Sequence, residues 1–285
     1  MIAAASIRAI ESELRELNEA AAPPGEATTL RTRVLTHVAW VPPAWEPAAR
    51  IVLDGLGERH PSRTIMLLPD RDADRDEFDA DVDLRCFVQG GPKRAVCSEV
   101  VTVWLRGRTA SAPASVVQPL LVSDLPAFLR WRGALPYGAP ELEELVEVVD
   151  RLIVDSSEWD DPEADGARLA TLLDRVNVSD MAWARTEPWR RALAALWPGV
   201  AEARRLTVRG PRADGVLLAR WLGARLRRRV ELDAPDGDVV DHVDVDGTPA
   251  MPEPARPATP SELLSDQLEI FGRDRVYEEA VRSFS

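Results

Sequence analysis

Short, apolar, β-rich segments alternate with helical segments along most of this chain, and no other feature constrains its fold as strongly. The alternation is clearest after residue 110, where helical stretches separate strand candidates at 151–155, 204–210 and 227–233. Strands that alternate with helices are typical of a layered sheet whose neighbouring strands run mainly parallel. The sequence therefore predicts an α/β fold, with a layered, mainly parallel α/β domain in this part of the chain.

The first 110 residues follow a different order. The expected elements are a helix within residues 1–20, a strand at 31–41, a helix at 44–57, a strand at 64–68 and a hairpin centred on Gly90-Gly91-Pro92. The acidic stretch 70–83 is expected to be a solvated loop. These elements predict an N-terminal α+β unit with a hairpin.

The resulting domain organisation has four parts. We expect an N-terminal α+β domain at 1–110, an α/β domain at 111–246, a proline-rich linker at 247–260 and a C-terminal helical segment at 261–285.

Charge and composition exclude several classes of protein. The formal net charge of −13 argues against general nucleic-acid binding and against attraction to an anionic membrane surface. No run approaches the roughly 18 apolar residues that a membrane span needs. Two cysteines in 285 residues favour a reducing compartment, so we expect a cytoplasmic protein.

Familiar cofactor and metal motifs are missing from the sequence. Neither the dinucleotide loop G-x-G-x-x-G nor the phosphate loop G-x-x-x-x-G-K-[ST] occurs. His37, His60 and His242 are too scattered to indicate a catalytic triad or a metal site, although distance in sequence does not exclude contact in space. We therefore predict no cofactor, no metal and no catalytic residue.

Polar residues at strand ends form one candidate site. Ser62 and Arg63 precede a strand and could clamp an anion, or could cap a turn and pair with the nearby acidic loop. Arg132 lies at the end of a strand, where open α/β sheets form their binding crevice. Asp155 follows another strand and could bind a sugar hydroxyl or begin a capped helix. The corresponding hypothesis is a site for a sugar phosphate or a nucleotide.

Tryptophan and arginine side chains form a second candidate set. These are the residue types that most often anchor protein interfaces, and the set comprises Trp131, Arg132, Trp183, Arg185, Trp189 and Arg190. The alternative is that they seal a core, with arginine stems stacked on indole rings.

Cys86 and Cys97 lie symmetrically about the predicted hairpin turn. Symmetry places them directly opposite each other on paired strands, close to the separation that a disulfide needs. A redox switch is geometrically feasible, but the expected reducing compartment favours two reduced thiols in the core.

Four segments in order resemble a known family. They are GERHPSRTIML (57–67), SDLPAFLRWRG (123–133), DRLIVDSSEWDD (150–161) and MAWARTEPWR (181–190). Together they resemble the glucose-6-phosphate dehydrogenase assembly protein family, OpcA, over about residues 30–285. One departure is Arg130, where the family pattern has a bulky apolar or aromatic residue before the Trp-Arg pair.

The resemblance implies a non-catalytic partner of glucose-6-phosphate dehydrogenase. Such a protein would act in the pentose phosphate pathway as an assembly factor and allosteric activator, through protein–protein binding. The alternative from the residues alone is an enzyme or sensor that binds a small phosphorylated metabolite at Ser62, Arg63, Arg132 and Asp155.

Overall fold

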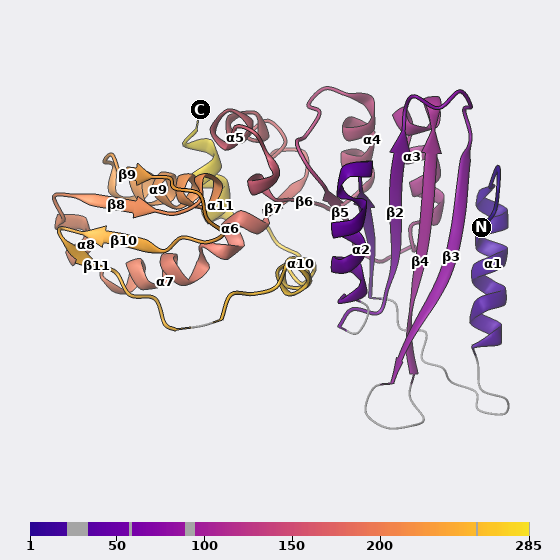
Figure 1. Ribbon diagram of the computed structural model, residues 1–285, viewed down its shortest axis with the longest axis horizontal. Coiled ribbons are helices and arrows are strands. Elements are labelled where there is room, and N and C mark those ends of the chain that lie inside the picture. The colour runs from indigo at the N-terminus through magenta and orange to yellow at the C-terminus, as the bar shows by residue number, and fades with distance from the viewer. Residues whose placement is uncertain (22–33, 57–58, 89–94, 255, 285) are drawn as a thin grey trace. The chain divides into compact units, whose positions relative to one another are not determined.

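The computed structural model describes the chain except for residues 22–33, 57–58, 89–94, 255 and 285 (Figure 1). The chain divides into two compact units, Met1–Leu152 and Ile153–Ser285. Residue 110, where the sequence predicted a domain boundary, lies in a short 3-10 helix inside the first unit. The predicted hairpin turn at Gly90-Gly91-Pro92 is outside the described residues.

The first unit is built on one sheet. Its strands are β1 (Leu35–Trp40), β2 (Ser62–Asp70), β3 (Phe78–Val88), β4 (Ala95–Arg106), β5 (Ala127–Trp131) and β6 (Arg151–Val154), and the division between units falls within β6. The strand order is β3-β4-β2-β1-β5-β6. β1 pairs in parallel with β2 and β5, and β2 with β4, whereas β3 and β4 are antiparallel. The predicted α/β fold with a mainly parallel sheet is confirmed, but β1, β2 and β4 of that sheet lie within residues 1–110, where the sequence predicted an α+β unit.

Helices cover this sheet. They are α1 (Ile7–Ala20), η1 (Pro43–Trp45), α2 (Glu46–Asp54), η2 (Gly107–Ser111), α3 (Ala114–Val117), η3 (Gln118–Leu120) and α4 (Pro140–Val148). Every residue of β1 is buried, as expected of a central strand in a parallel sheet. A cluster of Ala39, Val41, Ala49, Met66 and Leu68 packs α2 on β1 and β2.

The second unit contains a smaller, mixed sheet in the order β11-β10-β8-β9. Its strands are β8 (Leu206–Arg209), β9 (Glu231–Asp233), β10 (His242–Val245) and β11 (Thr248–Pro249), and β7 (Asn177–Asp180) lies beside β6. Its helices are η4 (Ser156–Glu158), α5 (Pro162–Leu169), α6 (Met181–Arg185), α7 (Glu187–Ala195), α8 (Gly199–Glu202), α9 (Arg212–Leu226), α10 (Pro260–Leu268) and α11 (Arg275–Arg282). α9 packs against β8 and β9.

One local expectation was wrong. The acidic stretch 70–83 is not all loop, because β3 begins at Phe78. Phe78, Ala80 and Val82 alternate with aspartates, and this period of two places apolar side chains on one face of a strand. The high charge of the stretch masked the alternation.

Candidate functional site

Trp131 belongs to the core of the first unit. β5 pairs with β1 so that Trp131 lies opposite Trp40, and the two indole rings stack with centroids 4.8 Å apart. The Trp131 indole donates to the carbonyl of Ala134 at 3.2 Å. Only 2% of Trp131 is exposed, so its ring contributes packing to the sheet and little surface to a partner.

Arg132 lies just beyond β5 and stacks on an indole ring. Its guanidinium carbon is 4.7 Å from the centre of the Trp45 ring, and its backbone N–H donates to Trp40 at 3.0 Å. The next residue must be small, because a Cβ on Gly133 would lie 3.0 Å from the Trp45 nitrogen and Gly133 has a φ of +80°. Arg130, the departure from the family pattern, is also buried and donates to the carbonyl of Trp131.

Arg63 is held by carboxylates of its own chain. Its Nε lies 2.7 Å from Glu99 on β4, and another nitrogen lies 2.6 Å from Glu11 on α1 and 3.0 Å from the carbonyl of Leu120. One of the two predicted alternatives was pairing with the downstream acidic loop, whereas the observed carboxylate partners come from α1 and β4. Ser62 is buried beside it, and its N–H lies 3.4 Å from the hydroxyl of Ser98.

His37 is one of two buried histidines in the first unit. Burial, and then the charges of Arg130 and His60, lower the pKa of His37 from its ordinary 6.5 to about 3, which favours the neutral ring. Neither ring nitrogen of His37 has a hydrogen-bond partner among the described residues. His60 lies near His37, whereas His242 is on β10 in the second unit.

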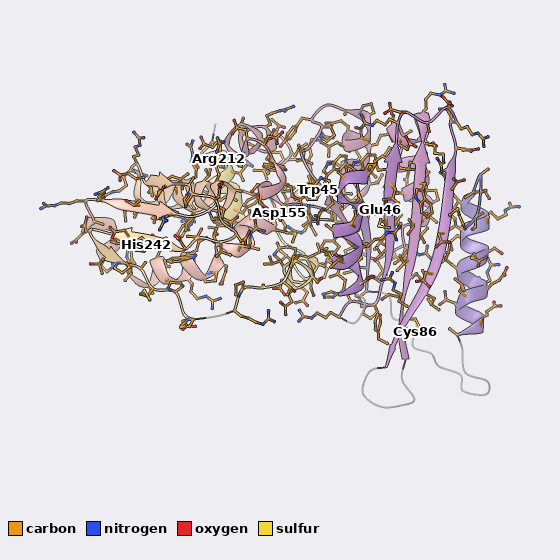
Figure 2. All side chains as sticks on the ribbon, in the orientation of Figure 1. Trp45, Glu46, Cys86, Asp155, Arg212 and His242 are labelled. Atoms are coloured by element: carbon orange, nitrogen blue, oxygen red, sulfur yellow. A yellow bond between two sulfur atoms is a disulfide. The ribbon has the colours of Figure 1, made fainter. Side chains whose placement is uncertain are left out.

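The second unit contains a buried ion-pair network centred on Arg185. Two guanidinium nitrogens of Arg185 donate to the carboxylate of Asp155 at 3.1 and 3.0 Å (Asp155 is labelled in Figure 2). The Nε and one terminal nitrogen of Arg185 donate to the carboxylate of Asp214, each at 2.9 Å. Burial lowers the pKa of Arg185, but hydrogen bonds to Asp214 and the charge of Asp155 outweigh it and raise the pKa above its ordinary value. Asp155 also caps η4, as one of the two predicted alternatives stated.

Asp180 is a further buried carboxylate of the second unit, which the sequence patterns did not single out. It accepts from the backbone N–H groups of Ser156 at 3.1 Å and Ala182 at 2.8 Å, and from the Tyr277 hydroxyl at 3.3 Å. Burial, and then the charge of Asp155, raise the pKa of Asp180 to about 6. Its position immediately before the helical pattern of α6 was an N-cap signal that could have identified it.

Trp183 and Arg190 pack on each other inside the second unit. The guanidinium carbon of Arg190 is 3.7 Å from the centre of the Trp183 ring, and the Trp183 indole donates to Asp274 at 2.9 Å. Burial lowers the pKa of Arg190 to about 10, so it stays protonated at neutral pH. Trp189 is half-buried and donates to the carbonyl of Val240 at 3.1 Å.

The structure therefore groups the predicted residues differently from the sequence. Trp131 and Arg132 belong to the first unit, and Trp183, Arg185, Trp189 and Arg190 to the second. Of the predicted ligand set, Ser62, Arg63 and Arg132 belong to the first unit and Asp155 to the second. Arg63 and Asp155 are each engaged by opposite charges within their own unit.

Cys86 and Cys97 are directly opposed on β3 and β4, as their symmetry predicted, and they form a disulfide. The favoured expectation of two reduced thiols in the core is corrected on both counts. The antiparallel register brings the two Cα atoms to 4.0 Å, and Cys86 is exposed (Figure 2).

Within the described residues, no group of three His, Cys, Asp or Glu side chains is arranged to hold a metal ion. No helix in the same part of the chain combines the length and apolar character that crossing a bilayer requires.

Comparison with known proteins gives one family. Residues 54–171 match the OpcA_G6PD_assem family model, described as "Glucose-6-phosphate dehydrogenase subunit N-terminal domain". The resemblance to the OpcA family is confirmed.

Three relatives, each named OxPP cycle protein OpcA, agree with this match. The chain is 26% identical over 186 residues to the protein of Nostoc punctiforme, 27% over 184 residues to that of Synechococcus elongatus, and 25% over 189 residues to that of Synechocystis sp.. These alignments cover 60–62% of this chain but only 39–41% of each relative. The chain thus matches about two fifths of the length of these OpcA proteins.

Proposed function

We propose that this chain is a non-catalytic assembly factor and allosteric activator of glucose-6-phosphate dehydrogenase, which acts by protein–protein binding in the oxidative pentose phosphate pathway. The observation that carries the proposal is the family match over residues 54–171, whose description names that enzyme. A cytoplasmic location is part of the same proposal.

The contacts of the candidate residues support a binding role over a catalytic one. Arg63, Asp155 and Arg185 are paired with opposite charges of the chain itself. A reacting group must be accessible to substrate, whereas these groups are buried and fix the positions of neighbouring elements. We interpret them as the framework that keeps a partner-binding surface in shape.

Activation would follow from differential binding. A partner protein shifts an enzyme toward an active conformation or oligomer only by the difference in its affinity for the two states. Couplings of this kind are typically about 1–3 kcal/mol, which corresponds to about 5- to 150-fold in affinity.

Within the predicted tryptophan and arginine set, the half-buried members are the better candidates for direct contact. Trp189 and Arg190 lie on α7 and keep part of their side chains accessible. Trp131, Arg132 and Trp183 are buried and Arg185 is mostly so. We propose that Trp183 and Arg185, which belong to the same unit as α7, support this surface from beneath.

The alternative function, binding of a sugar phosphate or a nucleotide at Ser62, Arg63, Arg132 and Asp155, gains no support from these contacts. An anion at Arg63 would have to displace Glu99 and Glu11, and a ligand at Asp155 would have to displace Arg185. Breaking a buried pair leaves an uncompensated charge and costs about 3–5 kcal/mol.

Complex formation tests the proposal. The purified chain and the dehydrogenase from the same source should co-elute with a defined mass in size-exclusion chromatography with light scattering. The double variant Trp189→Ala with Arg190→Ala should weaken the complex at least about fivefold, since tryptophan and arginine are the most frequent interface hot spots. Arg191→Ala is the matched control, because Arg191 neighbours Arg190 on α7 but is exposed and pairs only with Glu187 among the described residues. A double variant that folds and still binds fully would refute the assigned surface, and no complex with the wild-type chain would refute the function.

A further inference from the structure

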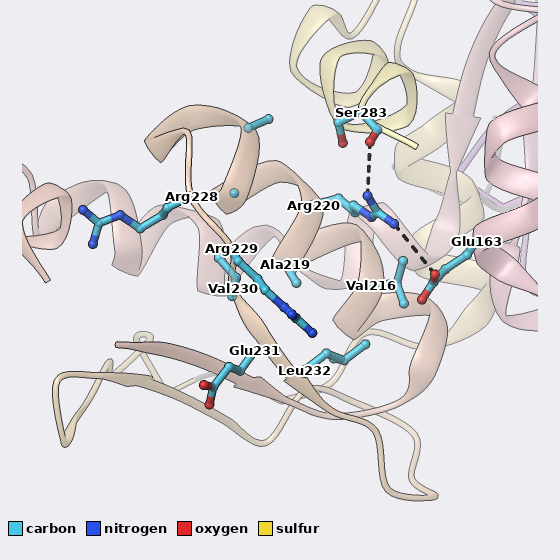
Figure 3. A pocket seen from close by; sticks show the side chains of 12 residues that line it. Glu163, Val216, Ala219, Arg220, Arg228, Arg229, Val230, Glu231, Leu232 and Ser283 are labelled. Carbon is cyan, nitrogen blue, oxygen red and sulfur yellow. Dashed lines mark hydrogen bonds and ion pairs between the residues drawn. The ribbon is translucent and has the colours of Figure 1, made fainter. Parts of the chain in front are cut away.

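The second unit has an open groove between α9 and the edge of its small sheet (Figure 3). Its volume is about 1080 Å³. The residues that line it include Val216, Ala219, Val230 and Leu232, which give it an apolar floor, and Arg220, Arg228 and Arg229, which give it positive charge. None of these residues belongs to the candidate site described above.

The charges in the groove do not balance. Glu163 is 3.7 Å from Arg220, and Glu231 is 3.1 Å from Arg205, an arginine outside the groove. Arg228 donates to the carbonyl of Ala201 at 3.2 Å, and its charge also acts on Asp246, a carboxylate outside the groove. Arg229 forms no ion pair with any described residue. The groove therefore offers positive charge that its own carboxylates do not neutralise, in a chain whose net charge is −13.

One wall of the groove is an edge strand. β9 is the last strand in the sheet order and pairs only with β8 among the described strands. Gly210 donates to the carbonyl of Asp233 at 3.1 Å, so that carbonyl points toward β8. Carbonyl directions alternate along a strand, and the carbonyl of Leu232 therefore points to the open edge. An incoming strand would find backbone groups there to pair with.

The arginines are spread along the groove and do not converge on one point. Figure 3 shows Arg229 directed into the space between α9 and β9, with Arg228 pointing away toward one end and Arg220 toward Glu163 at the other. A single phosphate would favour convergent donors. Side chains on one face of an extended chain are about 6.6 Å apart, so separated arginines fit separated carboxylates.

We propose that this groove docks an extended, acidic segment of a protein partner. The segment would add a strand to β9, place apolar side chains on Ala219 and Leu232, and place carboxylates on Arg228 and Arg229. Main-chain hydrogen bonds then give affinity, while the arginines and the apolar floor select the sequence. The inference goes beyond the proposed function, because it holds whether or not the partner is the dehydrogenase.

The test uses the full chain and a fluorescent hexapeptide of alternating valine and glutamate, with binding followed by anisotropy. We expect saturable binding that weakens at least about tenfold in the double variant Arg228→Glu with Arg229→Glu. The single variant Arg227→Glu is the matched control, since Arg227 is an exposed neighbour that does not line the groove. A peptide with proline replacing the central valine should also bind at least about tenfold more weakly, because proline removes a backbone donor.

Each other outcome overturns the inference. Absence of binding to the wild-type chain at millimolar peptide means that no such site exists. Equal binding to the Arg228→Glu, Arg229→Glu variant places the peptide elsewhere. Equal binding of the proline peptide excludes strand addition. Full competition by inorganic phosphate at low millimolar concentration identifies a small-anion site instead of a docking groove.

Discussion

The two units of this chain arrange their buried charges differently. The first unit is a sheet whose central strand is completely buried, and its buried charges form separate groups, such as Arg63 with Glu99 and Glu11, and Glu141 with Arg71. The second unit surrounds a polar centre, in which Asp155, Asp214 and Asp180 lie close to Arg185 or to backbone donors. Removing the cation that two buried carboxylates share leaves both of them uncompensated, whereas breaking a separate ion pair leaves one buried charge uncompensated. The second unit should therefore be the more sensitive to single substitutions.

The largest effect is expected from Arg185→Leu. This change leaves two buried carboxylates, Asp155 and Asp214, without their cation and should cost about 3–5 kcal/mol of unfolding free energy. Hydrogen exchange with mass spectrometry should show lost protection confined to residues 153–285. The matched variant Arg63→Leu leaves only one fully buried carboxylate, Glu99, because Glu11 is 38% exposed, and should cost less. An equal or larger loss of unfolding free energy in Arg63→Leu would contradict the prediction that the second unit is the more sensitive one.

A smaller effect concerns the pH dependence of the second unit. The folded-state pKa of Asp180 is about 6, above its ordinary value of 3.8, so the folded protein binds this proton more tightly than the unfolded chain does. Protonation of Asp180 therefore raises the free energy of unfolding. This contribution is complete below about pH 4 and is lost as pH rises through 6, so the free energy of unfolding falls by about 3 kcal/mol over that range.

Asp180→Asn should remove this dependence, since an amide oxygen can still accept from Ser156 and Ala182. Urea denaturation of both proteins between pH 4 and 7 measures it. Parallel pH curves for the two proteins would show that Asp180 does not carry a raised pKa.

The first unit should respond to pH in the opposite direction. His37 has a folded-state pKa of about 3, below its ordinary 6.5, so its stability contribution is complete above pH 6.5 and is lost as pH falls toward 3. In that range the free energy of unfolding falls by about 1.4 kcal/mol for each pH unit. At pH 5 it is therefore about 2 kcal/mol lower than above pH 6.5. His37→Leu should flatten the acid limb of the curve, and hydrogen exchange at pH 5 should place the wild-type loss within residues 1–152. Loss of protection in the second unit instead would contradict the assignment.

Sequence patterns predicted the apolar part of this structure well. Strands β1, β2, β4, β5 and β6 and the order of helices follow from apolar runs and turn residues, which are local signals. β3 was partly missed because its polar face is unusually acidic.

The contacts of the candidate residues were much harder to predict. Arg63 meets Glu11 and Glu99, which are 52 and 36 residues away, and Arg185 meets Asp155 and Asp214 at 30 and 29 residues. No periodicity connects such pairs, so a single sequence identifies charged residues without identifying their partners. Segments rich in tryptophan and arginine did indicate close packing between these two residue types, because Arg132 stacks on Trp45 and Arg190 stacks on Trp183. It does not distinguish a core contact from an interface.

The most direct test of the proposed function is the steady-state turnover of glucose-6-phosphate dehydrogenase over a range of substrate concentrations, with increasing amounts of this purified chain. We predict a saturable rise in rate or a lower apparent KM, reached at a fixed ratio of the two proteins. Unchanged kinetics at saturating chain, with the enzyme from the same source, would contradict the proposal that this chain is an activator of the dehydrogenase.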